Sequence, residues 1–223
     1  MSSIKNHIHT ILQKIHQAEE KHHRQPGAVS LLAVSKKQSS EKIREAYHAG
    51  QTCFAENYLQ ETLQKQRDLS DLDIEWHFIG TIQSNKTKLI AQQFDWVHSV
   101  DRLSIAEKLN RHCESLKKIL NICIEINIDS EQTKSGALPQ DVIDLAKNIA
   151  TLKHLKLRGL MVIPEKDNPL LAFQKTAELQ QQLMLNGFSL DTLSMGMSND
   201  FEAAIAAGST IVRIGTAIFG ERV

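Results

Sequence analysis

The feature that most limits the fold of this 223-residue chain is a regular alternation of short apolar runs with longer amphipathic stretches. The runs have the length and composition of buried β-strands, whereas the stretches between them have helical periodicity with start and stop signals. The runs are eight in number, at Leu31–Ser35, Thr52–Ala55, Glu75–Gly80, Trp96–Val100, Asn121–Ile128, Leu155–Ile163, Leu190–Met195 and Thr210–Ile214. Strand–helix alternation predicts a parallel sheet of the α/β class, and eight units predict a closed (β/α)8 TIM barrel.

An open, doubly wound sheet is the alternative architecture. It is disfavoured because no glycine-rich GxGxxG turn follows the first strand. A stripe of isoleucines that begins with Ile4 and Ile8 predicts an extra N-terminal helix within residues 1–24, which Pro26-Gly27 ends. No linker or shift in composition divides the chain, and its length is at the short end of the range for barrels. We therefore expect residues 1–223 to form a single domain.

Composition and charge argue against several classes of function. Lys+Arg and Asp+Glu both number 26, so the chain lacks the basic excess that is typical of nucleic-acid-binding proteins. The scattered cysteines, Cys53, Cys113 and Cys123, fit neither a disulfide framework nor a zinc ribbon, and no HExxH motif occurs. No apolar run approaches the length of a membrane span, and the N-terminus has no signal-peptide core. We expect a cytoplasmic protein without a metal site and without a nucleic-acid or membrane partner.

In such a barrel the active site lies at the C-terminal ends of the strands, and phosphate groups often bind at the loops after strands seven and eight. Ser198 and Asn199 follow the seventh strand and precede a short predicted helix, whose first turn has free amide N–H groups. Gly215 and Thr216 follow the eighth strand, where glycine allows close approach of the backbone and threonine adds a hydroxyl. Each feature also has an ordinary explanation, either an N-cap that contributes about 1 kcal/mol or a turn. Their occurrence on adjacent loops favours a phosphate site.

Two cations belong to the same predicted end of the barrel. Arg213 is flanked by apolar residues in the eighth strand, and a buried arginine needs an acceptor, either a ligand atom or a carboxylate such as Glu125 or Asp129. Lys36 follows the first strand. A lysine at a barrel mouth, between walls of low dielectric and near another cation, is more readily neutral, as Schiff-base chemistry requires. The adjacent Lys37 is an equally placed rival, and either lysine can simply be solvated.

Several motifs resemble those of one known family. They are LLAVSK (31–36), FAENY (54–58), EWHFIGTIQSNK (75–86), KSG (134–136), RGLMVIP (158–164), GMSND (196–200) and VRIGTAIFG (212–220). In order and spacing they are similar to the pyridoxal phosphate homeostasis proteins, also called the proline synthase co-transcribed family. The WHFIG…QSNK block is highly specific. The resemblance implies a fold-type III barrel related to the N-terminal domain of alanine racemase, with pyridoxal 5′-phosphate (PLP) as the cofactor.

The same resemblance implies roles for individual residues. Lys36 would carry PLP as a Schiff base, and Arg213 would face the pyridine nitrogen. The other implied cofactor contacts are Ser198, Gly215 and Thr216 at the phosphate, Asn57 near the ring, and His77 and Met161 at the mouth. Asn199 stands where the family usually has aspartate, and Thr81-Ile82 where it usually has Pro-Leu. Neither departure removes an implied ligand.

Taken together, these features imply a non-catalytic protein of PLP (vitamin B6) homeostasis. An arginine at the pyridine nitrogen weakens the cofactor as an electron sink. Racemisation also needs two acid/base groups, and the only tyrosines, Tyr47 and Tyr58, lie early in the chain. The alternatives are a weak PLP-dependent amino-acid racemase, with water or His77 as second proton carrier, and a Schiff-base aldolase or phosphosugar isomerase. PLP-dependent apo-enzymes are candidate partners, and we expect a monomer or a weak dimer.

Overall fold

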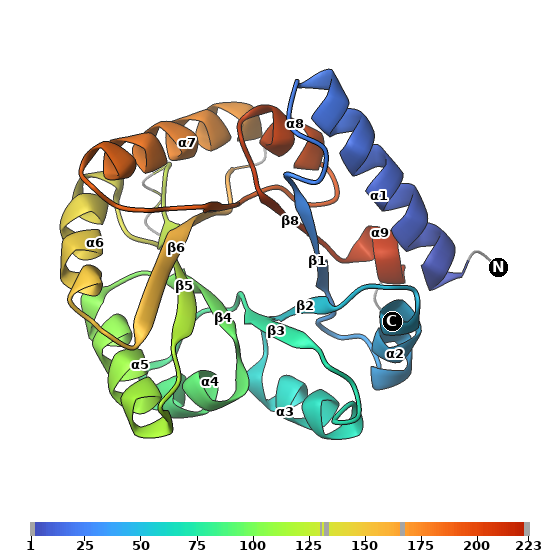
Figure 1. Cartoon of the computed structure of the whole chain (residues 1–223), viewed down its shortest axis with the longest axis horizontal. Helices are drawn as coiled ribbons and strands as arrows, with labels where there is room; N and C mark the ends of the chain where they lie inside the picture. Colours follow the sequence, from blue (N-terminus) through green and yellow to red (C-terminus); the bar gives the residue numbers. More distant parts are fainter. Residues whose placement is uncertain (1–2, 130, 132–133, 166–167, 221–223) are drawn as a thin grey trace.

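The computed structural model describes residues 3–129, 131, 134–165 and 168–220. Eight parallel strands close a barrel in the order of the sequence (Figure 1). They are β1 (Ser30–Val34), β2 (Cys53–Glu56), β3 (Glu75–Phe78), β4 (Trp96–Val100), β5 (Leu120–Ile126), β6 (Leu155–Val162), β7 (Thr192–Ser194) and β8 (Ile211–Ile214). Because β1 pairs with both β2 and β8, the sheet has no open edge. The predicted (β/α)8 barrel is therefore confirmed.

Helices alternate with the strands and cover the outside of the barrel (Figure 1). They are α1 (Ile4–Lys21), α2 (Ser40–His48), α3 (Leu59–Asp68), α4 (Thr87–Gln93), α5 (Leu103–Leu116), α6 (Val142–Ala150), α7 (Pro169–Leu185), α8 (Phe201–Ala206) and α9 (Thr216–Phe219). Short 3-10 turns, η1 (Ser84–Lys86) and η2 (Pro139–Asp141), precede α4 and α6. Among the described residues, no helix combines the length and apolarity that crossing a bilayer requires.

The extra helix, α1, lies on the outside of the barrel beside α2, α8 and α9 (Figure 1). It begins at Ile4 and ends at Lys21, so it is shorter than the predicted 1–24. One stripe of it is buried in the core, formed by Ile4, Ile8, Ile11, Ile15 and Ala18. The buried carboxylate of Glu19 accepts hydrogen bonds from the amides of Gly27 and Val29, at 3.1 and 2.8 Å. These bonds fix the turn that leads from α1 into β1.

The inside of the barrel is partly polar. Alternate residues of a strand face opposite sides of the sheet. The large apolar core, which includes residues of the outer helices, is distinct from two small buried clusters, formed by Leu32, Val34 and Ala55 and by Trp96, Cys123 and Met161. Buried polar side chains of the strands accompany these clusters, among them His77, His98, Ser194 and Arg213. These polar groups need partners within the barrel.

Candidate functional site

A cavity of about 500 Å³ lies at the C-terminal ends of the strands. All but one of the predicted site residues line it, namely Lys36, Asn57, Met161, Ser198, Arg213, Gly215 and Thr216. Apolar side chains, including those of Val34 and Ile79, complete its walls. Apolar walls with a few converging polar groups are typical of a site for a small ligand or cofactor.

His77 is the predicted site residue that the structure places elsewhere. Its ring stacks on Trp96, with 5.4 Å between centroids and 10° between planes. It lines a different cavity of about 350 Å³, formed mainly by residues near the starts of the strands. The expectation that His77 lines the mouth is therefore wrong. The reason is its level along the strand: Ile79, two residues further on, occupies the level of the C-terminal cavity.

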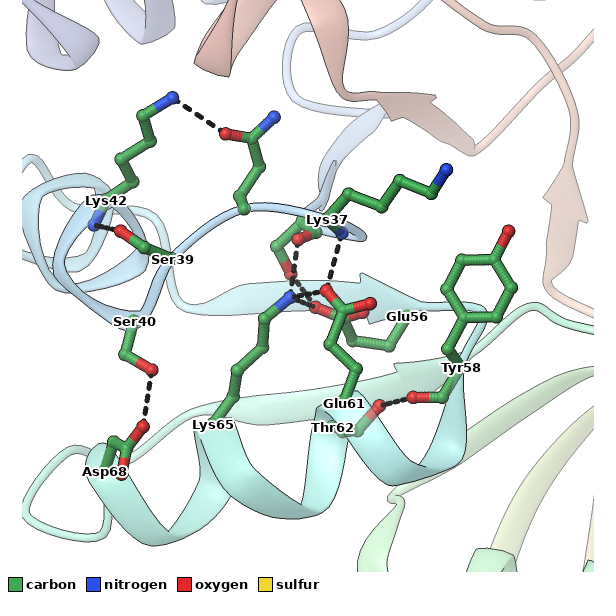
Figure 2. Close-up of polar contacts among 12 residues, drawn as sticks. Lys37, Ser39, Ser40, Lys42, Glu56, Tyr58, Glu61, Thr62, Lys65 and Asp68 are labelled. Atoms are coloured by element: carbon green, nitrogen blue, oxygen red, sulfur yellow. Dashed lines mark hydrogen bonds and ion pairs between the residues drawn. The ribbon is translucent and has the colours of Figure 1, made fainter. Parts of the chain in front are cut away.

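The loop after β1 distinguishes Lys36 from Lys37. Lys36 is half-buried and lines the C-terminal cavity, whereas Lys37 is exposed. The backbone of Lys37 has φ 60°, in the left-handed region that residues with a side chain rarely adopt. Its amide donates to Oε1 of Glu61 at 2.5 Å, which holds this turn against α3 (Figure 2). The backbone thus places only the first of the two lysines in the cavity.

A buried network of charged side chains from β2 and α3 holds the same loop (Figure 2). Nζ of Lys65 lies 2.7 Å from Oε1 of Glu56 and 2.5 Å from Oε1 of Glu61. It also donates to the carbonyl of Ser35 at 2.7 Å, while the Ser35 hydroxyl donates to Glu56 at 2.6 Å. Burial raises the pKa of Glu56 and outweighs the opposing effect of Lys65. The network therefore ties the residue before Lys36 to β2 and α3.

Arg213 reaches the cavity from β8 as a buried cation, 4% exposed. Its Nη2 donates to the carbonyl of Val162 at 2.9 Å, and its Nη1 donates to the hydroxyl of Ser194 at 2.8 Å and to the carbonyl of the same serine. Burial lowers the pKa of Arg213 to about 10, with Glu125 as the largest opposing influence. The guanidinium therefore stays charged at neutral pH.

Arg213 forms no salt bridge with a carboxylate of the described residues, although Glu125 and Asp200 attract it at longer range. Within the described part of the chain, its hydrogen bonds go to uncharged oxygens of Ser194 and Val162. Burial raises the pKa of Glu125 to about 7, with Asp101 adding to the rise and Arg213 opposing it. A carboxyl with a pKa near neutrality is only partly ionised there, so it balances the arginine only in part. The cation is suited to an acceptor atom of a bound molecule.

The loop after β7 presents Ser198 and Asn199 to the cavity. The Met197 amide donates to Oδ1 of Asp200 at 2.5 Å, and the amides of Asp200 and Phe201 donate back to the Met197 carbonyl at 3.1 and 2.9 Å. The N-cap of α8 is Asp200. The ordinary explanation of Ser198 or Asn199 as the cap is therefore wrong, and both residues lie within a closed turn at the rim of the cavity.

The loop after β8 faces the same cavity. A Cβ atom at Gly215 would lie 2.9 Å from the carbonyl oxygen of Val34 in β1. A side chain there would push the neighbouring strand away, so glycine lets the backbone line the cavity directly. Thr216 begins α9 and adds a hydroxyl to the lining. Together with the β7 loop, these groups offer the hydrogen-bond donors that a phosphate requires.

Comparison with known proteins identifies the family. The model for "Alanine racemase, N-terminal domain" matches residues 7–223. The chain therefore belongs to this family of β/α barrels.

Comparison with individual relatives shows to which group within the family the chain is most similar among those compared. The pyridoxal phosphate homeostasis protein of Pseudomonas aeruginosa is 49% identical over 223 residues, which covers 100% of this chain and 97% of the relative. The protein of the same name from Vibrio cholerae is 51% identical over 230 residues, covering 100% of this chain and 98% of the relative. The structure of PipY from Synechococcus elongatus, with PLP bound, has a TM-score of 0.83 at 36% identity and covers 92% of this chain and 100% of its own. Within the family, this chain groups with the pyridoxal phosphate homeostasis proteins.

Three buried polar residues around the site were not anticipated. Lys65 lies in a polar helical stretch, where an exposed lysine is the usual expectation. His98 and Ser194 lie within short strands, each bonded to residues far away in the sequence. For His98 and Ser194 the available signal is a polar residue in a largely apolar strand, the same signal that marks Arg213.

Proposed function

We propose that this protein binds PLP as a Schiff base on Lys36 and takes part in PLP homeostasis as a non-catalytic carrier. The observation that carries the proposal is that Lys36 and Arg213 line one cavity with Ser198, Gly215 and Thr216. The names of the curated relatives and the PLP bound in PipY support it.

The residues that line the cavity fit the chemical groups of PLP. Ser198, Thr216 and the backbone at Gly215 would hold the phosphate, and Arg213 would donate a hydrogen bond to the ring nitrogen. Since the guanidinium is charged, it would keep that nitrogen unprotonated. PLP supplies an aldehyde for tethering and, in enzymes, a ring that accepts electrons. Arg213 would leave the aldehyde available for tethering and would weaken the ring as an electron acceptor.

The tether would form by condensation. The Lys36 amine would attack the aldehyde carbon, one water would leave, and a C=N bond would replace the C=O bond. An incoming amine would displace Lys36 by exchange at the same carbon, which returns the lysine side chain as a primary amine. A reversible tether of this kind suits a protein that stores PLP and passes it to apo-enzymes.

A weak racemase is the second candidate, because the alanine racemase fold is shared. Racemisation needs an acid/base group on each face of the substrate carbon. Tyr47 lines a surface hollow near the starts of the strands, and Tyr58 is 49% exposed. His77 lies at the opposite end of the barrel. Asp200, a carboxylate in the cavity lining, already accepts the Met197 amide. These positions favour the carrier.

The decisive experiment is borohydride reduction of the purified protein followed by peptide mass mapping. We expect a yellow protein whose visible absorbance band is lost in Lys36→Ala and kept in Lys37→Ala, with the reduced adduct on Lys36. A band that persists in Lys36→Ala, or an adduct on Lys37, would contradict the assignment. A colourless protein would favour a Schiff-base aldolase.

Chiral analysis separates the carrier from the racemase. L-alanine and L-serine incubated with the PLP-loaded protein should keep their configuration. Turnover at ordinary enzyme rates, about 1–1,000 per second, would instead identify an enzyme.

A further inference from the structure

A line of hydrogen bonds runs through the inside of the barrel, from the C-terminal cavity to the opposite end. Nη1 of Arg213 lies 2.8 Å from Oγ of Ser194, which lies 2.8 Å from Nδ1 of His98. Nε2 of His98 lies 2.8 Å from Nδ1 of His77, and Nε2 of His77 lies 2.8 Å from Oε1 of Glu75. We call these five residues the polar column. Its residues belong to strands β8, β7, β4 and β3, and each is hydrogen-bonded to the next.

The column is buried along its length and accessible at one end. Ser194 and His98 are 0% exposed, and His77 is 3% exposed. The Glu75 side chain is 45% exposed and lines the cavity at the starts of the strands, opposite the Lys36 cavity. Burial lowers the pKa of His98 well below its usual value, so this ring is neutral. The hydrogen bond from His77 lowers the pKa of Glu75, so this end carries a carboxylate.

The chemistry of the two ends gives the column a direction. Arginine can only donate, and a carboxylate can only accept. When both imidazole rings are neutral, one assignment satisfies every bond: Arg213 donates to Ser194, Ser194 to His98, His98 to His77, and His77 to Glu75. All donors then point from the cation to the carboxylate. Hydrogen bonds that point the same way polarise and strengthen one another inside a protein.

We propose that Glu75, His77, His98 and Ser194 are positioning residues for Arg213, which orient its guanidinium toward the cofactor. The inference rests on the proposed function, because the ring nitrogen of PLP is the acceptor that Arg213 would face. The coupling is long-range: a change at Glu75, at the far end of the barrel, alters the cofactor in the Lys36 cavity. If the column only satisfied buried polar groups, it would affect stability and leave the bound cofactor unchanged.

The test compares two exposed carboxylates at the same end of the barrel, in the full chain loaded with PLP. Glu75→Ala removes the last acceptor of the column, whereas Asp73→Ala removes a negative charge two residues earlier. The readouts are the absorbance maximum of bound PLP, the ¹⁵N shift of its ring nitrogen and its rate of dissociation. We expect Glu75→Ala to shift the absorbance maximum and the ¹⁵N resonance of bound PLP. We also expect it to change the dissociation rate about threefold, which corresponds to part of the free energy of one hydrogen bond. Asp73→Ala should match the wild type.

A second pair of variants tests the bond nearest the cavity. Ser194→Ala should accelerate PLP dissociation roughly tenfold, the size expected for one hydrogen bond to a charged group. Ser194→Thr keeps the hydroxyl and should restore most of the wild-type spectrum. A Ser194→Ala protein with a lower melting temperature but unchanged cofactor spectra and dissociation would overturn the inference.

The outcomes separate the two proposals. If Glu75→Ala and Asp73→Ala give the same cofactor spectra and dissociation, the long-range coupling is wrong while PLP binding stands. If the wild-type protein binds no PLP, the proposed function fails, and the positioning role fails with it.

Discussion

At the scale of single residues, the buried charges around the cavity determine how stability depends on pH. The folded pKa of Glu125, about 7, lies above its ordinary value of 4.5 because burial favours the protonated carboxyl. The resulting stabilisation is fully present below about pH 4.5 and is lost as the pH rises through about 7. Between pH 5 and pH 8 the PLP-free wild type should lose roughly 2–3 kcal/mol from this group.

Glu125→Gln should lack this loss, and urea unfolding at the two pH values measures it. The exposed Glu107 provides the control, since Glu107→Gln should keep the pH dependence of the wild type. An equal loss in Glu125→Gln and the wild type would show that the carboxyl is ionised in the folded protein at pH 5.

Lys65 leads to a second prediction at this scale. It is 4% exposed and pairs with Glu56, which is 0% exposed, so its removal leaves a buried carboxylate without its cation. We expect Lys65→Met to reduce the free energy of unfolding by about 3–5 kcal/mol. Lys147→Met, which breaks an exposed pair with Asp144, should cost less than about 1 kcal/mol. Comparable losses in urea unfolding would contradict the structural role given to Lys65.

At the scale of elements, α1 lies outside the eight-fold repeat but contributes to the core. Ile15 is 1% exposed, whereas Leu12 on the same helix is 37% exposed. We expect Ile15→Ala to lower the free energy of unfolding by about 2–5 kcal/mol and Leu12→Ala by well under half of that. Thermal and urea unfolding measure both. Similar small effects would mean that α1 is dispensable for the barrel.

The elements also show what a sequence can predict. Each predicted strand is present because a strand buried on both faces is a short, largely apolar run, and its length and flanking turn residues distinguish it from a buried helix. The predicted ends of the strands are less accurate. The observed β7 covers Thr192–Ser194, whereas the predicted run is Leu190–Met195. The difference arises because ladder hydrogen bonds, and not hydrophobicity, define where a strand ends. Lys36, Ser198 and Gly215 follow three different predicted strands and line one cavity. The position of His77 at the mouth was implied by the resemblance alone, and a sequence motif does not give the level of a side chain along the barrel axis.

Other parts of the site could not be predicted, for a physical reason. Whether a lysine in a polar helix is exposed or buried depends on the partner that the fold supplies. Lys65 meets Glu56 from another element, and His98 meets Ser194, 96 positions away in the sequence. Such pairings follow from closure of the barrel and have no local pattern.

At the scale of the whole molecule, ligand binding should raise the free energy of unfolding. A ligand that binds only the folded state stabilises it, by about 2.7 kcal/mol at a concentration one hundred times the dissociation constant. We therefore expect PLP to raise the melting temperature, and pyridoxal, which lacks the phosphate, to raise it less at equal concentration. Calorimetry with both compounds measures this difference. Equal shifts would contradict a phosphate site formed by Ser198, Gly215 and Thr216.

The turn at Lys37 has a consequence for the specificity of chemical modification. Two neighbouring lysines have the same intrinsic nucleophilicity, so an aldehyde in solution has no chemical basis for choosing between them. If PLP attaches to Lys36 as proposed, the handedness of the backbone makes that choice, since φ at residue 37 is positive and its amide donates to Glu61. To exchange the two amines, that dihedral angle would have to change sign and the bond would have to break. For the proposed attachment to Lys36, the main-chain conformation that Glu61 holds at residue 37 would therefore supply the regioselectivity.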